Sequence, residues 1–134
     1  MSDNFDNDSR DALIKYRLER SKETISEAVL LSNSGYYNAA VNRLYYACYY
    51  SAVALLLKNG ISVQTHAGVK TMIGLKFVNT GKLSPAIART FSILFNQRQS
   101  SDYDDFVYCD KEMVEELLPK AQDFLDAVKD LTMK

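Results

Sequence analysis

Hydrophobic and polar residues are spaced along most of this chain as in helices, and glycines mark where the helices end. Apolar positions three and four residues apart predict a first helix from about Arg10 to the turn at Gly35. A second helix is expected from about Tyr36 to Asn59, with Gly60 after it in a left-handed conformation. No segment shows the alternation with period two that marks strands. The pattern therefore predicts an all-α protein.

Caps and prolines predict further helices after the second one. Thr65 is placed to cap a third helix that runs through Asn79 and ends at Gly81. A serine followed by a proline at the first helical position starts a fourth helix, expected from Pro85 to about Ser101. These helices are separated by short connections, as in compact helical bundles.

The C-terminal third completes the predicted architecture. Asp110 is expected to cap a fifth helix, in which Pro119 predicts a kink or a late start. The only long connection is Asp102 to Cys109. We therefore expect one antiparallel, up-and-down bundle of four to five helices over residues 10–134, after a disordered lead-in at residues 1–9.

The second predicted helix is apolar on nearly every side, which is typical of a helix at a bundle's centre or in an oligomer interface. One of its stripes carries Arg43, Tyr46 and Tyr50. Two interpretations of this stripe are open. The tyrosines can bury their rings in the core with their hydroxyls at its rim. Alternatively, the guanidinium can hold a phosphate while the rings stack on nucleotide bases.

The end of the fourth helix carries a second polar group, formed by Arg98, Asp102 and Tyr103. The four-residue spacing allows an ion pair on one helix face. That pair can orient a cationic anchor for a ligand or close the end of the bundle, and both interpretations stay open. Because charges among apolar neighbours need partners, we predict that Arg43, Tyr46, Arg98, Asp102 and Tyr103 converge on one polar cleft.

Metal and acid–base chemistry have little support in the sequence. The aspartates Asp102, Asp104 and Asp105 lack the glycine turn and downstream acidic ligand of a calcium loop, which favours a solvated turn. His66 is the only histidine, and its position favours a structural hydrogen bond over catalysis. No phosphate-cradling glycine loop or catalytic triad is visible, so neither a metal nor a cofactor is expected.

Composition narrows the class of protein further. A length of 134 residues suits one domain, and the net charge of −1 argues against a strong nonspecific nucleic-acid binder but allows a local basic groove. The apolar run Leu44 to Leu57 is shorter than the ~20 residues that span a membrane. Two isolated cysteines predict a reducing cytoplasm.

A symmetric homodimer is expected through the fourth helix and the loop after it. This helix supplies more apolar surface than one flank of a small bundle should need, and such patches usually mark interfaces: Ile87, Phe91, Ile93, Leu94 and Phe95.

Five motifs, in their order and spacing, resemble the HEPN domain, a small helical domain named for nucleotide binding in higher eukaryotes and prokaryotes. The motifs are Tyr16-Arg17-Leu18-Glu19-Arg20, Gly35-Tyr36-Tyr37-Asn38-Ala39-Ala40, Asn42-Arg43-Leu44-Tyr45-Tyr46-Ala47, Thr65-His66-Ala67-Gly68-Val69 and Arg98 through Tyr103. The resemblance spans about Tyr16 to Leu131. It implies a bundle of four to five helices, often a symmetric dimer, and a small nucleotidyltransferase partner in a toxin–antitoxin or defence pair.

Many HEPN proteins are metal-independent ribonucleases that carry arginine, four to six residues and then histidine on the late helix. Arg98 matches that arginine, but no histidine follows it, and His66 lies in another element. The chain more closely resembles the branch with Arg-x-x-x-Asp-Tyr, which implies a nucleotide- or RNA-binding module with weak catalysis or none. The alternatives are a ribonuclease toxin that uses Arg98 with His66 or Tyr103, and a structural helical adaptor.

Overall fold

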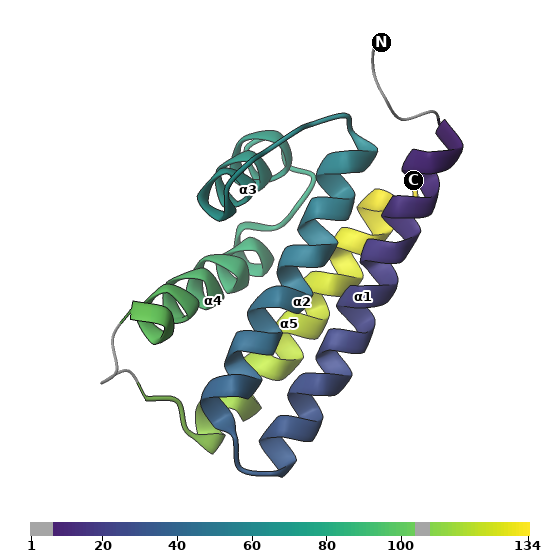
Figure 1. Ribbon diagram of the computed structural model, residues 1–134. Coiled ribbons are helices and arrows are strands. Elements are labelled where there is room, and N and C mark those ends of the chain that lie inside the picture. The colour runs from purple at the N-terminus through teal and green to yellow at the C-terminus, as the bar shows by residue number, and fades with distance from the viewer. Residues whose placement is uncertain (1–6, 104–107) are drawn as a thin grey trace.

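The computed structural model describes residues 7–103 and 108–134, with side chains described outside 99–103. Five α-helices and one π-helical segment form this part of the chain, which contains no strand, so the all-α prediction is confirmed (Figure 1). The elements are α1 (Asn7–Asn33), α2 (Tyr37–Lys58), α3 (His66–Ile73), η1 (Gly74–Val78), α4 (Pro85–Tyr103) and α5 (Lys111–Thr132). Part of the expected lead-in, residues 1–6, lies outside the described residues, whereas residues 7–9 already belong to α1.

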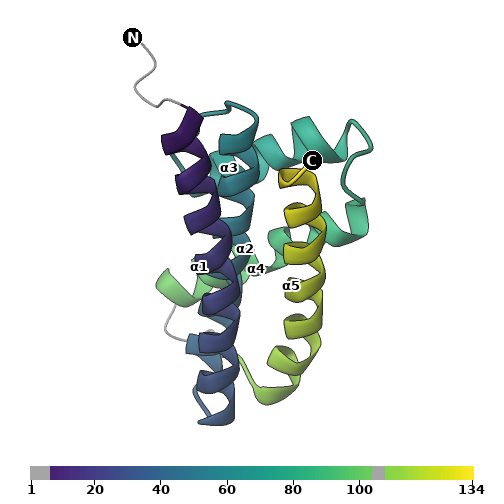
Figure 2. The same ribbon diagram turned by 90° about the vertical axis from the view of Figure 1, so that its right-hand side faces the viewer.

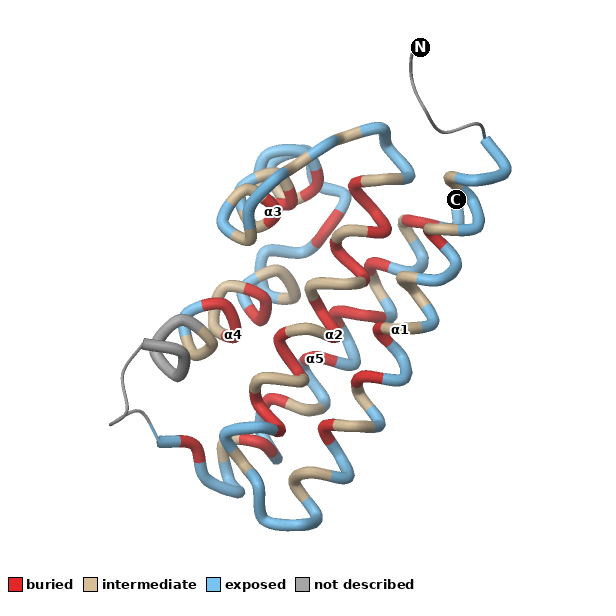
Figure 3. Tube along the Cα trace, in the orientation of Figure 1, coloured by how far each residue is buried: buried red, intermediate tan, exposed pale blue. Residues whose placement is uncertain are grey.

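The three long helices α1, α2 and α5 lie together, and α1 runs in the opposite direction to the other two (Figures 1 and 2). Helices α3 and α4 lie obliquely on the side of α2 away from α1 (Figure 1). Helix α2 contacts all four other α-helices. One of its stripes is fully buried, as the red segments of Figure 3 show: Ala40, Leu44, Ala47, Ser51 and Ala54. Helix α2 is therefore the central helix that its apolar sequence predicted.

Most of the predicted helix ends are where the caps and glycines placed them. Gly35 and Gly60 follow α1 and α2 with φ of 85° and 69°, a conformation that glycine adopts without a Cβ clash. Thr65 caps α3 by accepting a hydrogen bond from the Gly68 amide at 2.9 Å. The third helix does not continue regularly to Asn79, however, because η1 follows it with a wider turn. There the Asn79 amide donates to the Gly74 carbonyl oxygen, five residues back, at 2.9 Å.

The last helix starts at its predicted cap and continues through its proline. The Asp110 carboxylate accepts a hydrogen bond from the Met113 amide at 2.9 Å, and α5 begins at Lys111. The late start that Pro119 suggested is therefore wrong. Pro119 lies on the exposed side of α5, where water can replace the amide that the Glu115 carbonyl lacks.

The core joins α2, α4 and α5 through stacked aromatic rings. The Phe91 ring lies between that of Tyr45, with centroids 5.7 Å apart, and that of Phe124, with centroids 5.4 Å apart. The neighbouring Leu94 and Phe95 are also buried, while Ile87 and Ile93 are half-buried against the same core. These apolar side chains of α4 therefore pack against the core of their own chain. They do not form an exposed apolar patch on α4, so they give no support for a dimer through this helix.

Two smaller expectations concern the cysteines and the membrane. Cys48 and Cys109 are both buried and both free thiols. Among the described helices, none combines the length and the apolar character that a membrane span requires. The burial of Cys48 raises the pKa of its thiol well above the ordinary range, so it is not a nucleophile.

Candidate ligand-binding site

Helix α2 carries two pairs of tyrosines one turn apart, and these rings form the centre of the candidate site. Tyr45 is fully buried, whereas Tyr46, Tyr49 and Tyr50 are half-buried. The ring centroids of Tyr45 and Tyr46 are 5.1 Å apart, and those of Tyr46 and Tyr50 are 6.0 Å apart. Because helical residues four apart share a face, the half-buried rings give α2 an aromatic surface beside the core.

Arg98 reaches this aromatic surface from α4. Its Nε donates a hydrogen bond to the Tyr46 hydroxyl at 3.2 Å. Its guanidinium carbon lies 5.8 Å from the centroid of the Tyr46 ring and 5.5 Å from that of Tyr45, within cation–π range of both. A guanidinium stays charged at every physiological pH, so these contacts fix a permanent cation beside two tyrosines.

Arg43 approaches the same ring from within α2. Its guanidinium carbon lies 5.1 Å from the Tyr46 centroid, and its Nη2 donates to the Asn42 side-chain oxygen at 3.1 Å. The structure thus brings together Arg43, Tyr46 and Arg98, three of the five residues predicted to converge. The side chains of Asp102 and Tyr103 lie outside the described residues.

His66 joins this group, although it begins a different helix. Its Nδ1 and the Tyr45 hydroxyl form a hydrogen bond of 2.7 Å, in which the tautomer decides which group donates. Its ring stacks on Tyr49, with centroids 4.3 Å apart and planes 20° apart. We call the residues that meet here the arginine–tyrosine cluster: Arg43, Tyr45, Tyr46, Tyr49, His66 and Arg98. The structural hydrogen bond expected of His66 is present, but its partner Tyr45 was not foreseen, because the contact depends on how α3 folds back onto α2.

Helix α1 adds a further cation, Arg20, whose place beside the tyrosines was not predicted. The Arg20 guanidinium carbon lies 5.7 Å from the Tyr50 centroid. Arg20 also pairs with Glu23 at 3.2 Å and with Glu27 at 3.3 Å, and the other Glu27 oxygen lies 3.6 Å from Arg43. Glu27 therefore links the two arginines and offsets part of their charge. The only signal for Arg20 was its place in the motif from Tyr16 to Arg20.

The electrostatics of the cluster exclude Tyr45 and Tyr49 as bases. Burial raises the pKa of Tyr45 well above the ordinary tyrosine value, although the Arg98 charge acts in the opposite direction. Burial also raises the pKa of Tyr49. Both phenols are therefore neutral near pH 7 and act as hydrogen-bonding and stacking groups. Among the described residues, no group of three or more histidines, cysteines, aspartates or glutamates could hold a metal ion, and Asp104 and Asp105 lie outside them.

These pKa shifts predict that the free energy of unfolding falls at alkaline pH. In the unfolded chain Tyr45 ionises at about pH 10, whereas in the folded chain burial raises its pKa and keeps it neutral to higher pH. Its contribution to stability is therefore present below the unfolded pKa and is lost as the pH rises above it. Urea denaturation between about pH 7 and pH 10.5 should show this decline, and Tyr45→Phe should reduce its slope. Tyr108→Phe removes an exposed phenol as the control; an equal change of slope in both variants would contradict the assignment.

Comparison with known proteins gives a consistent picture. Residues 14–131 match the family model for the HEPN domain. A UPF0332 protein of Thermotoga maritima is 35% identical over 122 residues, which cover 91% of this chain and 92% of that protein. A Methanocaldococcus jannaschii protein that bears the name "Putative toxin" is 34% identical over 84% of this chain and 76% of its own length. The crystal structure of an archaeal HEPN homologue superposes with a TM-score of 0.71 over 89% of this chain and 97% of that one, and at 19% identity this likeness concerns the fold.

Proposed function

The chain belongs to the HEPN domain family, and from this premise we propose that it binds a phosphate-bearing ligand, an RNA strand or a nucleotide, at the arginine–tyrosine cluster. The observation that carries the proposal is the position of two guanidinium groups, Arg43 and Arg98, against the ring of Tyr46. Arginine holds phosphate oxygens through a planar fork of donors and needs no proton transfer to do so. Half-buried tyrosine rings offer faces on which unpaired bases stack.

Catalysis is expected to be weak or absent in this proposal. Cleavage assisted by the 2′-hydroxyl of RNA needs a group that moves a proton near neutral pH, and histidine is the side chain suited to it. No histidine follows Arg98 in the chain. The phenols of the buried Tyr45 and the half-buried Tyr49 have raised pKa values, which makes them poor bases near pH 7. Loss of acid–base help alone costs about a hundred- to ten-thousandfold in rate.

A metal-independent ribonuclease toxin is the second candidate, and the position of His66 favours it. The hydrogen bond with Tyr45 and the stacking on Tyr49 hold this histidine in the same cluster as Arg98. In this mechanism His66 takes the proton of the 2′-hydroxyl, and that oxygen attacks the phosphorus. The bond to the 5′-oxygen then breaks, this leaving oxygen takes a proton from water, and Arg98 stabilises the charge on the phosphoryl oxygens. Two Methanocaldococcus jannaschii relatives with toxin names are consistent with this candidate.

The proposal also covers the oligomeric state and the partner protein. We infer a cytoplasmic homodimer that acts beside a small nucleotidyltransferase in a toxin–antitoxin or related defence pair. Support for the pairing comes from the family and from the toxin names of two relatives. Support for a reducing compartment comes from the free thiols Cys48 and Cys109.

Purified protein mixed with a fluorescein-labelled single-stranded RNA in EDTA separates the two candidates. We expect saturable binding that weakens as salt rises, because phosphate contacts release counterions, and intact RNA on a denaturing gel. His66→Ala should then leave the affinity largely unchanged. Metal-independent cleavage by the wild type that His66→Ala abolishes, with binding retained, would favour the toxin. Absence of any salt-dependent binding would contradict both candidates.

A further inference from the structure

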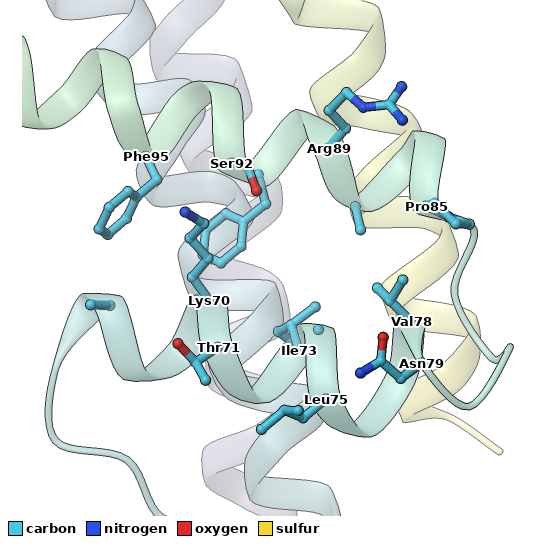
Figure 4. A pocket seen from close by; sticks show the side chains of 14 residues that line it. Lys70, Thr71, Ile73, Leu75, Val78, Asn79, Pro85, Arg89, Ser92 and Phe95 are labelled. Atoms are coloured by element: carbon cyan, nitrogen blue, oxygen red, sulfur yellow. The ribbon is translucent and has the colours of Figure 1, made fainter.

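A groove separate from the arginine–tyrosine cluster runs between α4 on one side and α3 with η1 on the other (Figure 4). Its volume is about 560 Å³, within the range of sites that hold small ligands or groups of side chains. None of its lining residues belongs to the cluster. The groove is therefore a second candidate binding surface with its own chemistry.

The floor of the groove is apolar. Ile73, Phe91 and Phe95 form part of it and are buried in the core below. Leu75 stands beside it with 51% of its surface exposed. Gly74 also lines the groove, and a Cβ added to it would meet nothing within 4 Å. The groove is thus open above Gly74, and Leu75 beside it offers exposed apolar surface to a partner.

The charge of the groove has one sign. Lys70 and Arg89 are the charged residues of its lining, and no carboxylate of the described side chains lines it. Within the described part of the chain, neither cation forms an ion pair. Lys70 extends from α3 toward α4, where its ammonium lies 5.0 Å from the Phe95 centroid, and Arg89 lies toward the Pro85 end (Figure 4). In a chain of net charge −1, this surface carries two positive charges, which favours an anionic partner.

The shape of the groove favours a helix as the occupant. Two helical walls line it, one from Ala67 to Asn79 and the other from Pro85 to Phe95. At about 1.5 Å per residue, the shorter wall is roughly 15 Å long, the length of about ten helical residues. An amphipathic helix that lies in such a groove buries apolar side chains at one face and leaves its polar flanks at the rims.

We propose that this groove docks an acidic amphipathic helix of a partner protein. The apolar face of that helix covers Leu75 and the half-buried Val78 and Ala88, and carboxylates on its flanks pair with Lys70 and Arg89. The hydroxyls of Thr71 and Ser92 and the amide of Asn79 give the rims further hydrogen-bonding groups. This proposal is independent of what the arginine–tyrosine cluster binds.

Gly74 offers a variant that blocks the groove without disturbing the chain below it. Its backbone is ordinary right-handed helix, with φ −61° and ψ −50°, so a side chain there causes no backbone strain. Gly74→Leu fills the open space, whereas Gly74→Ala adds only a methyl group and serves as the matched control. A double change of Lys70→Glu and Arg89→Glu reverses the charge of the rims. Circular dichroism checks that each variant is folded.

The test uses two fluorescein-labelled helical peptides of about 14 residues, with leucines at i, i+3 or i+4 and i+7, and with either glutamates or lysines at the flanks. Fluorescence polarisation should show that the full-length protein binds the glutamate peptide at least about tenfold more tightly than the lysine peptide. Gly74→Leu should lose that binding, Gly74→Ala should retain it, and the double glutamate variant should prefer the lysine peptide.

Three outcomes would overturn the proposal. The first is that neither peptide binds. The second is that the glutamate peptide binds equally well to the wild type and to Gly74→Leu, which would place the contact elsewhere. The third is that sedimentation shows a wild-type dimer that Gly74→Leu converts to monomer, which would assign the groove to a second copy of this chain.

Discussion

Replacing Arg98 with alanine is expected to weaken the binding of single-stranded RNA by at least about tenfold while the helical fold is retained. The change removes the cation that contacts Tyr45 and Tyr46, and with it the hydrogen bond to the Tyr46 hydroxyl. A hydrogen bond from a charged group to a ligand phosphate is worth about 1.5–3 kcal/mol, and about 1.4 kcal/mol corresponds to tenfold in affinity. Arg98 is half-buried rather than part of the core, so its loss should leave the fold intact.

Fluorescence polarisation at fixed salt, with thermal unfolding of each variant, measures this effect. Lys129→Ala removes one positive charge from α5, which contributes no residue to the arginine–tyrosine cluster, and it should change the affinity little. Arg98→Lys should fall between the wild type and Arg98→Ala, because lysine keeps the charge but loses the planar fork. Equal losses in Arg98→Ala and Lys129→Ala would show that binding depends on net charge alone and would contradict a site at Arg98.

Phe91→Ala is expected to lower the free energy of unfolding by about 3–5 kcal/mol. The Phe91 side chain is 1% exposed and stacks on Tyr45 of α2 and on Phe124 of α5. Its truncation removes contacts with both neighbouring helices and leaves a cavity where α2, α4 and α5 meet. Because these helices are closely packed, they cannot easily move to fill that cavity. Since small domains have a total stability of about 5–15 kcal/mol, the loss is a large fraction of the whole.

Urea denaturation followed by circular dichroism gives the two free energies. Phe91→Leu keeps most of the volume and should cost clearly less, which keeps the test informative if the alanine variant does not fold. Leu30→Ala truncates an exposed apolar side chain of α1 and should change the stability by less than about 0.5 kcal/mol. Similar losses in Phe91→Ala and Leu30→Ala would contradict the central role of the Phe91 ring.

The helix pattern was predictable because it depends on local chemistry. Thr65 and Asp110 cap the helices that follow them, and Gly35 and Gly60 end the helices before them, as their residue types require. The π-helical turn at Gly74–Val78 was not predictable from periodicity, because the order of apolar and polar residues in these five positions also fits an α-helix.

The candidate site was predictable only where its contacts are local or charged. Arg43 and Tyr46 meet because they are three residues apart on one helix, and Arg98 was expected to find a partner because charge among apolar residues needs one. The contact between His66 and Tyr45 spans 21 residues of chain and depends on the tertiary path of α3. The apolar residues of α4 were misjudged for the same reason, since the crossing with α2 and α5 is what buries Phe91.

Tyr45 belongs to the core and to the arginine–tyrosine cluster at once. One face of its ring stacks on Phe91, its hydroxyl bonds His66, and the Arg98 guanidinium lies 5.5 Å from its centroid. The rings that a ligand would meet are therefore held in place before it arrives, and little side-chain entropy is lost on binding. The same arrangement couples stability to binding: a change that repacks the centre of the bundle also changes the surface at which we propose that the ligand binds.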